Sequence, residues 1–180
     1  MKSIWTIIGL IATLLSCSTV ALADATSDLT AVMAAFNALH SYHVDMTLGN
    51  GQQVQFDFVA PSSYHEIMPG GLEMVITPGS TRMKMNGKWQ TIPQKFTGNL
   101  SKSMDSARTW SSDNNNKSKY TITDLGMDGG FHKYQMEEQG TSSFIWVRHD
   151  NLPDHMEVHN QSTTTLIQYS KFNEPIPFPT

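Results

Sequence analysis

Apolar residues recur every three or four positions between residues 27 and 39, which is the spacing of one face of an α-helix. Ser27 has a side chain of the type that caps a helix N-terminus. The pattern therefore predicts an amphipathic helix of about twelve residues whose apolar stripe needs a surface to cover. The stripe consists of Leu29, Val32, Met33, Phe36 and Leu39.

From residue 42 the apolar positions alternate with polar ones, which is typical of β-strands with one buried face. The first two alternating runs are separated by Asn50-Gly51, a dipeptide favoured in tight hairpin turns. Similar runs follow as far as residue 169. We expect strands at residues 42–48, 54–58, 72–76, 83–85, 88–92, 120–125, 131–137, 143–148, 155–159 and 163–169.

The strand pattern stops between residues 96 and 119. There, Leu100, Met104 and Ala107 have the spacing of a short helix, and residues 111–118 form a polar, asparagine-rich loop. We therefore expect a helical insertion between two runs of strands. The predicted fold class is mainly β with short helices (α+β), with about nine or ten antiparallel strands and two helices in one domain.

A sheet of this length must curl or be covered on its apolar face, and only two short helices are available to cover it. Because these helices only partly fill the space inside a curved sheet, the pattern predicts an apolar cavity. In the alternative interpretation the same side chains pack into a dry core, and the protein works through its surface. The alternation of residues does not choose between the two.

Methionine content favours the cavity. Ten of the eleven methionines lie after residue 23, and methionine adapts well to irregular space and flexible apolar ligands. We predict a hydrophobic ligand site formed by Met46, Phe56, Phe58, Met74, Met83, Met85, Trp89, Tyr134, Met136, Trp146 and Met156. The helices are expected to act as a lid through Leu29, Phe36, Leu100 and Met104.

Residues 1–23 have the layout of a secretory signal peptide. They contain Lys2, then an apolar run over residues 4–15, then small residues ending at Ala21-Leu22-Ala23. The apolar run is shorter than the roughly 20 residues that span a bilayer. We expect cleavage after Ala23, which leaves residues 24–180 as a single periplasmic domain.

Residues 14–17 also fit a bacterial lipobox, in which a lipid on Cys17 anchors the protein in the outer membrane. The two interpretations differ in whether the protein diffuses or is attached to a membrane, peripherally or by lipid. Cys17 is the only cysteine, so the domain that follows has no disulfide and no thiol chemistry. Removal of Lys2 changes the formal net charge from −4 to −5, and this acidic balance without clustered cations argues against nucleic acid as a partner.

Four local phrases carry a resemblance to a known family. They are Phe56-Asp57-Phe58-Val59-Ala60-Pro61 followed by Tyr64, the hairpin Met83-Lys84-Met85-Asn86-Gly87-Lys88-Trp89 ending at Pro93, Ile145-Trp146-Val147 leading to Leu152-Pro153, and Tyr169-Ser170-Lys171-Phe172-Asn173. Their order and spacing resemble the LolA-like family of exported lipoprotein carriers and lipid-binding lipoproteins.

This resemblance implies an unclosed, curved antiparallel β-barrel with a helical lid. It also implies non-catalytic binding of acyl chains of lipids or lipoproteins, or of another hydrophobic ligand, with donor and acceptor proteins in the envelope. In the carriers of this family an arginine couples the lid to the barrel. Arg82, Arg108 and Arg148 are candidates by residue type, and the sequence does not choose among them.

The seven histidines raise an alternative, a periplasmic copper-binding protein that uses methionine and histidine. His155 and His159 share one face of a predicted strand but lie about 13 Å apart, too far to hold one ion without a bend. Met83 and Met85 offer soft ligands for Cu(I), although two such methionines on one strand more often belong to a core. We predict no metal site and no cofactor.

The sequence contains no Gly-x-Ser-x-Gly elbow, no His-Glu-x-x-His and no phosphate-binding glycine loop. His65-Glu66 is followed by Met68-Pro69, and this proline would break the helix that a zinc motif requires. We therefore predict that the protein is not an enzyme.

Overall fold

The computed structural model describes residues 21–97, 100, 104, 121–138 and 140–179. In this part of the chain, one antiparallel sheet contains 11 strands in the order β6-β5-β4-β3-β2-β1-β11-β10-β9-β8-β7. The strands are β1 (Ser41–Thr47), β2 (Gln53–Val59), β3 (Ser63–Ile67), β4 (Glu73–Thr77), β5 (Ser80–Met85), β6 (Lys88–Ile92), β7 (Thr121–Asp128), β8 (Phe131–Glu138), β9 (Thr141–Val147), β10 (Pro153–Asn160) and β11 (Thr163–Ser170). The helices are α1 (Ala21–Asn37) and the short α2 (Gln94–Thr97).

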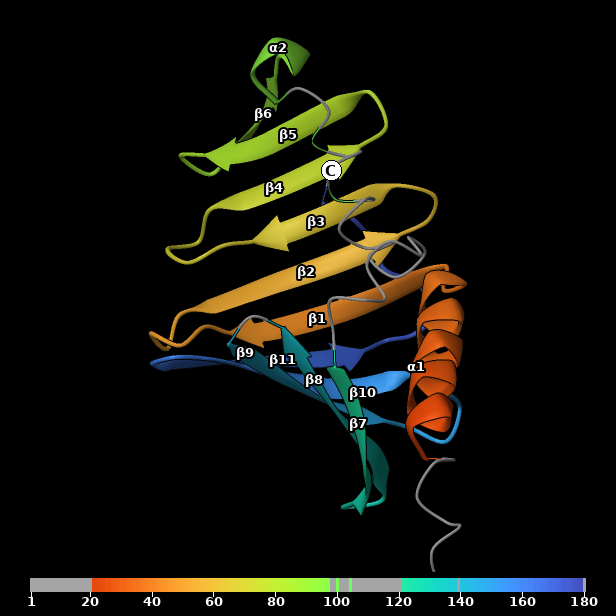
Figure 1. Cartoon of the computed structure of the whole chain (residues 1–180). Coiled ribbons are helices and arrows are strands. Elements are labelled where there is room, and N and C mark those ends of the chain that lie inside the picture. The colour runs from red at the N-terminus through yellow and green to blue at the C-terminus, as the bar shows by residue number, and fades with distance from the viewer. Residues whose placement is uncertain (1–20, 98–99, 101–103, 105–120, 139, 180) are drawn as a thin grey trace, which may run out of the picture.

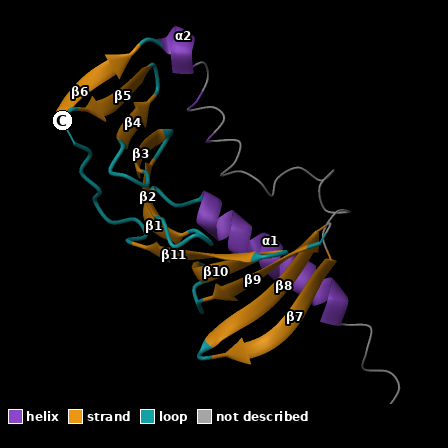
Figure 2. Ribbon diagram, turned by 90° about the vertical axis from the view of Figure 1, so that its left-hand side faces the viewer, coloured by secondary structure: helices purple, strands orange, loops and turns teal. Residues whose placement is uncertain are grey.

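The strand order follows from hairpins between neighbours in sequence. Strands that are consecutive in sequence pair with one another within the run β1 to β6 and within the run β7 to β11, and the pairing of β1 with β11 joins the two runs. The sheet is strongly curved and does not close, so that β6 and β7 are its free edges (Figures 1 and 2). The predicted mainly β, curved and unclosed architecture is confirmed, and a closed barrel is not formed.

Helix α1 lies on the concave side of the sheet (Figure 2), which we call the inner face; the opposite side is the outer face. The buried side chains of α1 recur every three or four residues, as the apolar stripe predicts. They pack into two clusters of buried residues. One contains Phe36, Leu39, Tyr42, Val44, Phe58, Tyr64, Met74 and Ile76, and the other contains Ala25, Leu29, Val32, Tyr134, Met136, Ile145 and Val147.

The hairpin turn between β5 and β6 lies at Asn86-Gly87, where the sequence predicts a turn. The two residues have φ angles of 52° and 75°. Two consecutive positive φ angles are what the favoured two-residue hairpin turn requires, and asparagine followed by glycine adopts them at low cost.

Two elements differ from the predictions. Helix α1 is already present at Ala21, the first described residue, rather than starting after Ser27, because the alanines in this stretch favour helix formation. Strand β3 was not expected at all, which raises the number of strands above the predicted nine or ten. The predicted helix around Leu100 and Met104 lies mostly outside the described residues, and the polar loop at 111–118 lies entirely outside them. Leu100 and Met104 are described, and both side chains are partly buried against the first cluster.

The segment at residues 171–179 follows β11 and crosses the outer face toward β5 (Figure 2). At its start, the Asn173 backbone N–H donates to the Ser41 carbonyl at 2.9 Å. Near its end, the Arg82 guanidinium donates to the Pro179 carbonyl at 2.7 Å. The sheet is therefore covered by α1 on one face and by this segment on part of the other. Among the described helices, none is both long enough and apolar enough to span a membrane.

Candidate functional site

A cavity of about 400 Å³ lies between α1 and the inner face of the sheet. Its volume falls within the range of pockets that hold small ligands, roughly 300–1,000 Å³. The described residues that line it are Leu29, Val32, Met33, Phe36, Tyr42, Val44, Met46, Val54, Phe56, Glu66, Met104, Met136, Ile145, Pro153, Met156, Ile167 and Tyr169. All but a few of these side chains are apolar, so the cavity can accept a hydrocarbon ligand.

Strand pairing sets the order of the residues on the cavity floor. Val44 on β1 pairs with Tyr169 on β11 on one side and with Phe56 on β2 on the other. Phe56 pairs in turn with Glu66 on β3. Because directly paired residues point to the same face of a sheet, these four side chains form one row across four adjacent strands. Phe36 of α1 lies over one end of the row, 5.4 Å from the Tyr169 ring between centroids.

Several residues predicted from the sequence line this cavity. From the predicted ligand site they are Met46, Phe56, Met136 and Met156, and from the predicted lid they are Leu29, Phe36 and Met104. The structure thus brings together residues from α1 and from both halves of the sheet. Their role in ligand binding stays a prediction.

Other predicted residues lie beside the cavity rather than along it. Phe58 and Met74 belong to the first buried cluster, and Met83 and Leu100 pack against that cluster. Tyr134 lines a second, more polar hollow of about 280 Å³. There its hydroxyl donates to Asp28 Oδ2 at 3.3 Å. Met85 is 42% exposed at the end of β5.

Trp89 and Trp146 lie on the outer face, away from the cavity. Trp89 pairs with Lys84, whose Nζ is 5.8 Å from the centre of the indole. Trp146 stacks on His155 at 4.2 Å and donates from Nε1 to Asp128 at 2.9 Å. Residues 144–147 are all apolar, so the sequence does not show whether the odd-numbered or the even-numbered residues face inward. In the structure, Ile145 and Val147 face inward.

Glu66 and Tyr169 line the cavity, although the sequence does not predict them as site residues. Burial raises the pKa of the Glu66 carboxyl above its usual value, and burial raises the pKa of Tyr169 to about 12. Tyr169 is therefore an uncharged hydroxyl at neutral pH. Tyr64 and Glu66 are two residues apart, so in a strand they lie on the same face. This spacing was the one signal in the sequence that could have placed Glu66 on the inner face together with Tyr64.

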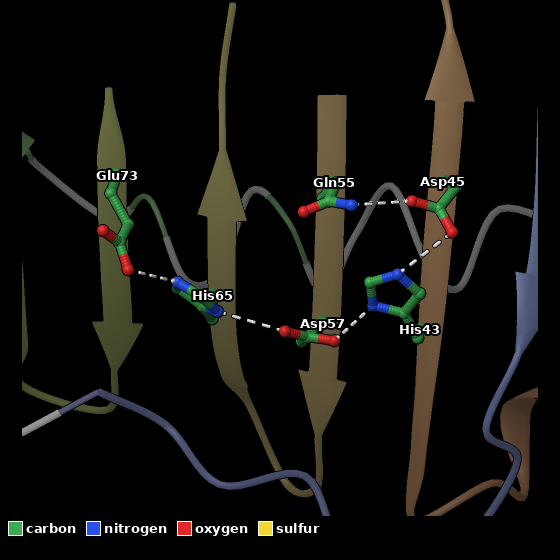
Figure 3. A network of polar contacts seen from close by, with 6 residues as sticks. All are labelled: His43, Asp45, Gln55, Asp57, His65 and Glu73. Atoms are coloured by element: carbon green, nitrogen blue, oxygen red, sulfur yellow. Dashed lines mark hydrogen bonds and ion pairs between the residues drawn. The ribbon is translucent and has the colours of Figure 1, made fainter. Parts of the chain in front are cut away.

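A row of polar side chains crosses the outer face of β1 to β4 (Figure 3). His43 lies between two carboxyl groups, with Nδ1 2.6 Å from Asp57 Oδ1 and Nε2 3.2 Å from Asp45 Oδ2. His65 is placed in the same way, with Nδ1 3.0 Å from Asp57 Oδ2 and Nε2 3.1 Å from Glu73 Oε1. Which partner donates in each contact depends on where the protons of the two rings lie.

This row has the properties of a structural network. Lys84 Nζ donates to Glu73 Oε2 at 2.6 Å, and this bond, more than the contact with His65, holds the pKa of Glu73 below its usual value against the opposing effect of burial. The His65 ring is buried and lies 6.0 Å from the Phe178 ring of the covering segment. Each charged group of the row thus has a partner within the sheet, and the covering segment lies beside His65.

In the described part of the chain, no three His, Cys, Asp or Glu side chains come together to hold a metal ion. His155 and His159 both lie on the outer face of β10, and each contacts a neighbouring carboxylate, Asp154 at 2.8 Å and Glu157 at 3.0 Å. Met83 packs against the first cluster and Met85 is exposed. Among the described residues, no contact therefore favours the copper-binding alternative.

Comparison with solved structures finds the same architecture in two mycobacterial proteins. The lipoprotein LppX of Mycobacterium tuberculosis superposes with a TM-score of 0.60, at 11% sequence identity, over 86% of this chain and 98% of its own. LprF of Mycobacterium bovis superposes with a TM-score of 0.56, at 13% identity, over 88% of this chain and 97% of its own. The chain has the LolA-like fold. No protein-family model and no curated sequence matches it.

The LolA-like fold confirms the architecture that the sequence resemblance implies. The lid-coupling arginine of the carriers has no counterpart among the described cavity residues. Arg82 binds the Pro179 carbonyl on the outer face, and Arg148 bonds to Asp150 and lies 5.4 Å from the Phe172 ring. Arg108 lies outside the described residues.

Proposed function

We propose that this protein is a non-catalytic binder or carrier of acyl chains, or of a related hydrophobic ligand, in the bacterial envelope. The observation that carries the proposal is the apolar cavity of about 400 Å³ between α1 and the inner face. A hydrocarbon chain placed there leaves water and contacts side chains on both walls, which is favourable in proportion to the apolar area buried.

The leader supports export. Residues 1–23 have the layout of a signal peptide, and in this proposal the protein is periplasmic, or anchored through Cys17 in the outer membrane. LppX, which shares the fold, is itself a lipoprotein. Proteins that deliver or accept the ligand are the expected partners of such a carrier.

The energetics give the proposal a measurable form. Each buried methylene contributes about 0.8 kcal/mol, which corresponds to roughly a fourfold decrease in Kd. In a series of saturated primary alcohols, the affinity is expected to increase by about this factor per added methylene until the chain fills the cavity, and then to level off.

The direct test uses N-phenyl-1-naphthylamine, an uncharged fluorescent probe of apolar sites, with one variant on each wall of the cavity. Met156→Glu on β10 and Met33→Glu on α1 place a carboxyl group in the cavity and are expected to abolish saturable binding. Met85→Glu adds the same charge at an exposed methionine outside the cavity and is the matched control, expected to bind like the unsubstituted protein.

Circular dichroism and thermal unfolding establish that each variant is folded before binding is compared. Equal binding by all three variants and the unsubstituted protein would show that the probe binds elsewhere. Absence of saturable binding by the unsubstituted protein would likewise contradict the proposal.

A further inference from the structure

Glu66 is the only charged side chain among the described residues that line the cavity. It lies on β3, where its cross-strand neighbours on the inner face are Phe56 and Met74. An aromatic ring and a thioether solvate a carboxylate poorly, so this position is unfavourable for a charge that has no other partner. A charged residue here is therefore a feature that packing alone does not explain.

No described residue forms a hydrogen bond or ion pair with the Glu66 carboxyl group. The contrast with the outer face of the same sheet is direct. There, Glu73 accepts a hydrogen bond from Lys84 and contacts His65, and Asp57 contacts two histidines. These outer-face carboxyl groups therefore have polar partners, whereas the Glu66 carboxyl on the inner face has none among the described residues.

A second polar group lies at the other end of the same row. Tyr169 on β11 is separated from Glu66 by Val44 and Phe56, which places the two about 14 Å apart at their Cα atoms, three strand spacings away. Among the described residues, the Tyr169 hydroxyl has no hydrogen-bond partner. The cavity floor is thus apolar in the middle, with an uncharged hydroxyl at one end and a carboxyl group at the other.

We propose that Glu66 recognises the polar end of an amphipathic ligand whose alkyl chain occupies the cavity, and that this end is a hydrogen-bond donor or a cation. The ligand class is a long-chain amine, amide or alcohol rather than a free fatty acid. A carboxylate in apolar surroundings accepts strong, charge-assisted hydrogen bonds from N–H and O–H groups. It repels a second carboxylate at the same place. The inference rests on the proposed function, because it requires that a chain enters the cavity.

The test is displacement of N-phenyl-1-naphthylamine by dodecylamine, dodecanol and dodecanoate at neutral pH, below the concentrations at which these compounds form micelles. The unsubstituted protein is expected to prefer dodecylamine over dodecanoate by about tenfold or more, the value of one hydrogen bond to a charged group. Glu66→Gln is expected to reduce that preference by about tenfold, and Glu66→Lys to reverse it.

Glu157→Gln is the matched control. It removes one negative charge from the outer face of β10, where Glu157 contacts His159 away from the cavity, and so measures the effect of the same change in net charge outside the cavity. It is expected to leave the preference unchanged.

The outcomes separate this inference from the proposed function. Displacement by all three compounds with no preference, or a preference that Glu66→Gln and Glu157→Gln change equally, would overturn the role of Glu66 and leave chain binding in place. Failure of every compound to displace the probe would overturn both.

Discussion

Phe56 and Glu66 are directly paired across β2 and β3 on the inner face, so the single carboxyl group among the described cavity residues lies beside an aromatic ring of the same cavity. The next pair along the two strands, Asp57 and His65, points to the outer face and belongs to the polar row. Strand register thus separates an apolar binding surface from a charged network within one layer of chain.

The partly buried position of Glu66, which has no polar partner among the described residues, predicts a pH-dependent stability effect. Because burial raises the pKa of Glu66 in the folded protein above 4.5, the unfolded chain loses this proton first as the pH rises. Stability from this group is therefore lost with increasing pH. Glu66→Gln is expected to raise the free energy of unfolding at neutral pH and to have little effect well below pH 4.5.

Urea unfolding of both proteins at several pH values measures this difference. A variant that is less stable at neutral pH would mean that the Glu66 carboxyl makes a favourable interaction within the folded chain.

Phe58 and Met156 predict a contrast between core and cavity lining. The Phe58 side chain is 1% exposed within the first cluster, and its replacement by alanine is expected to cost about 3–5 kcal/mol. Met156 faces the cavity on one side, so Met156→Ala removes fewer packing contacts and is expected to cost less than about 2 kcal/mol. Chemical denaturation gives both values, and similar losses at both positions would mean that the inner face is packed solid.

The ion pair of Glu73 and Lys84 predicts the opposite pH dependence from that of Glu66. The Lys84 hydrogen bond lowers the pKa of Glu73 in the folded state, so the unfolded chain takes up this proton first as the pH falls below 4.5. The stability that this carboxylate contributes is present above that pH and is lost as the pH falls through the folded-state value. Glu73→Gln is expected to destabilise the protein at neutral pH, with a difference that shrinks in acid.

Thermal unfolding across the acidic range measures the Glu73 effect, with Glu157→Gln on the outer face as the control. A difference between unsubstituted protein and Glu73→Gln that stays constant with pH would contradict the assignment.

The leader makes a prediction about the mature chain. Cleavage after Ala23 gives an N-terminus at Asp24 without lipid, whereas lipobox processing gives a mature chain that starts with acylated Cys17. We expect the first form in protein recovered from cell envelopes. Intact-mass measurement distinguishes the two, and release of a membrane-bound protein by Cys17→Ala would favour the second.

The sequence was informative wherever apolar alternation was regular. The turn at Asn86-Gly87 and the buried stripe of α1 were both predictable, because each depends on local backbone preference and one-sided burial. The fold class followed from the number of such strands and the shortage of helices to cover them.

The strand at Ser63–Ile67 could not be found in the same way, because Glu66 occupies one of its inner positions and breaks the apolar alternation. The residue that hid the strand is the residue to which we assign ligand recognition. Departures from local sequence rules are expected to concentrate at functional positions. Trp146, which was also predicted to line the cavity, lies on the outer face for another reason. It belongs to an apolar run in which only the register of the sheet decides which residues face inward.

The central claim is that an alkyl chain occupies the space between α1 and the inner face. Photo-crosslinking with a long-chain alcohol that carries a diazirine in its chain, followed by mass spectrometry of the labelled peptides, tests it most directly. The account predicts saturable labelling of α1 and of β1, β10 or β11, at cavity residues such as Met33, Val44 and Met156. Labelling confined to outer-face residues such as Trp89 and Trp146, or labelling that excess unlabelled alcohol does not reduce, would contradict it.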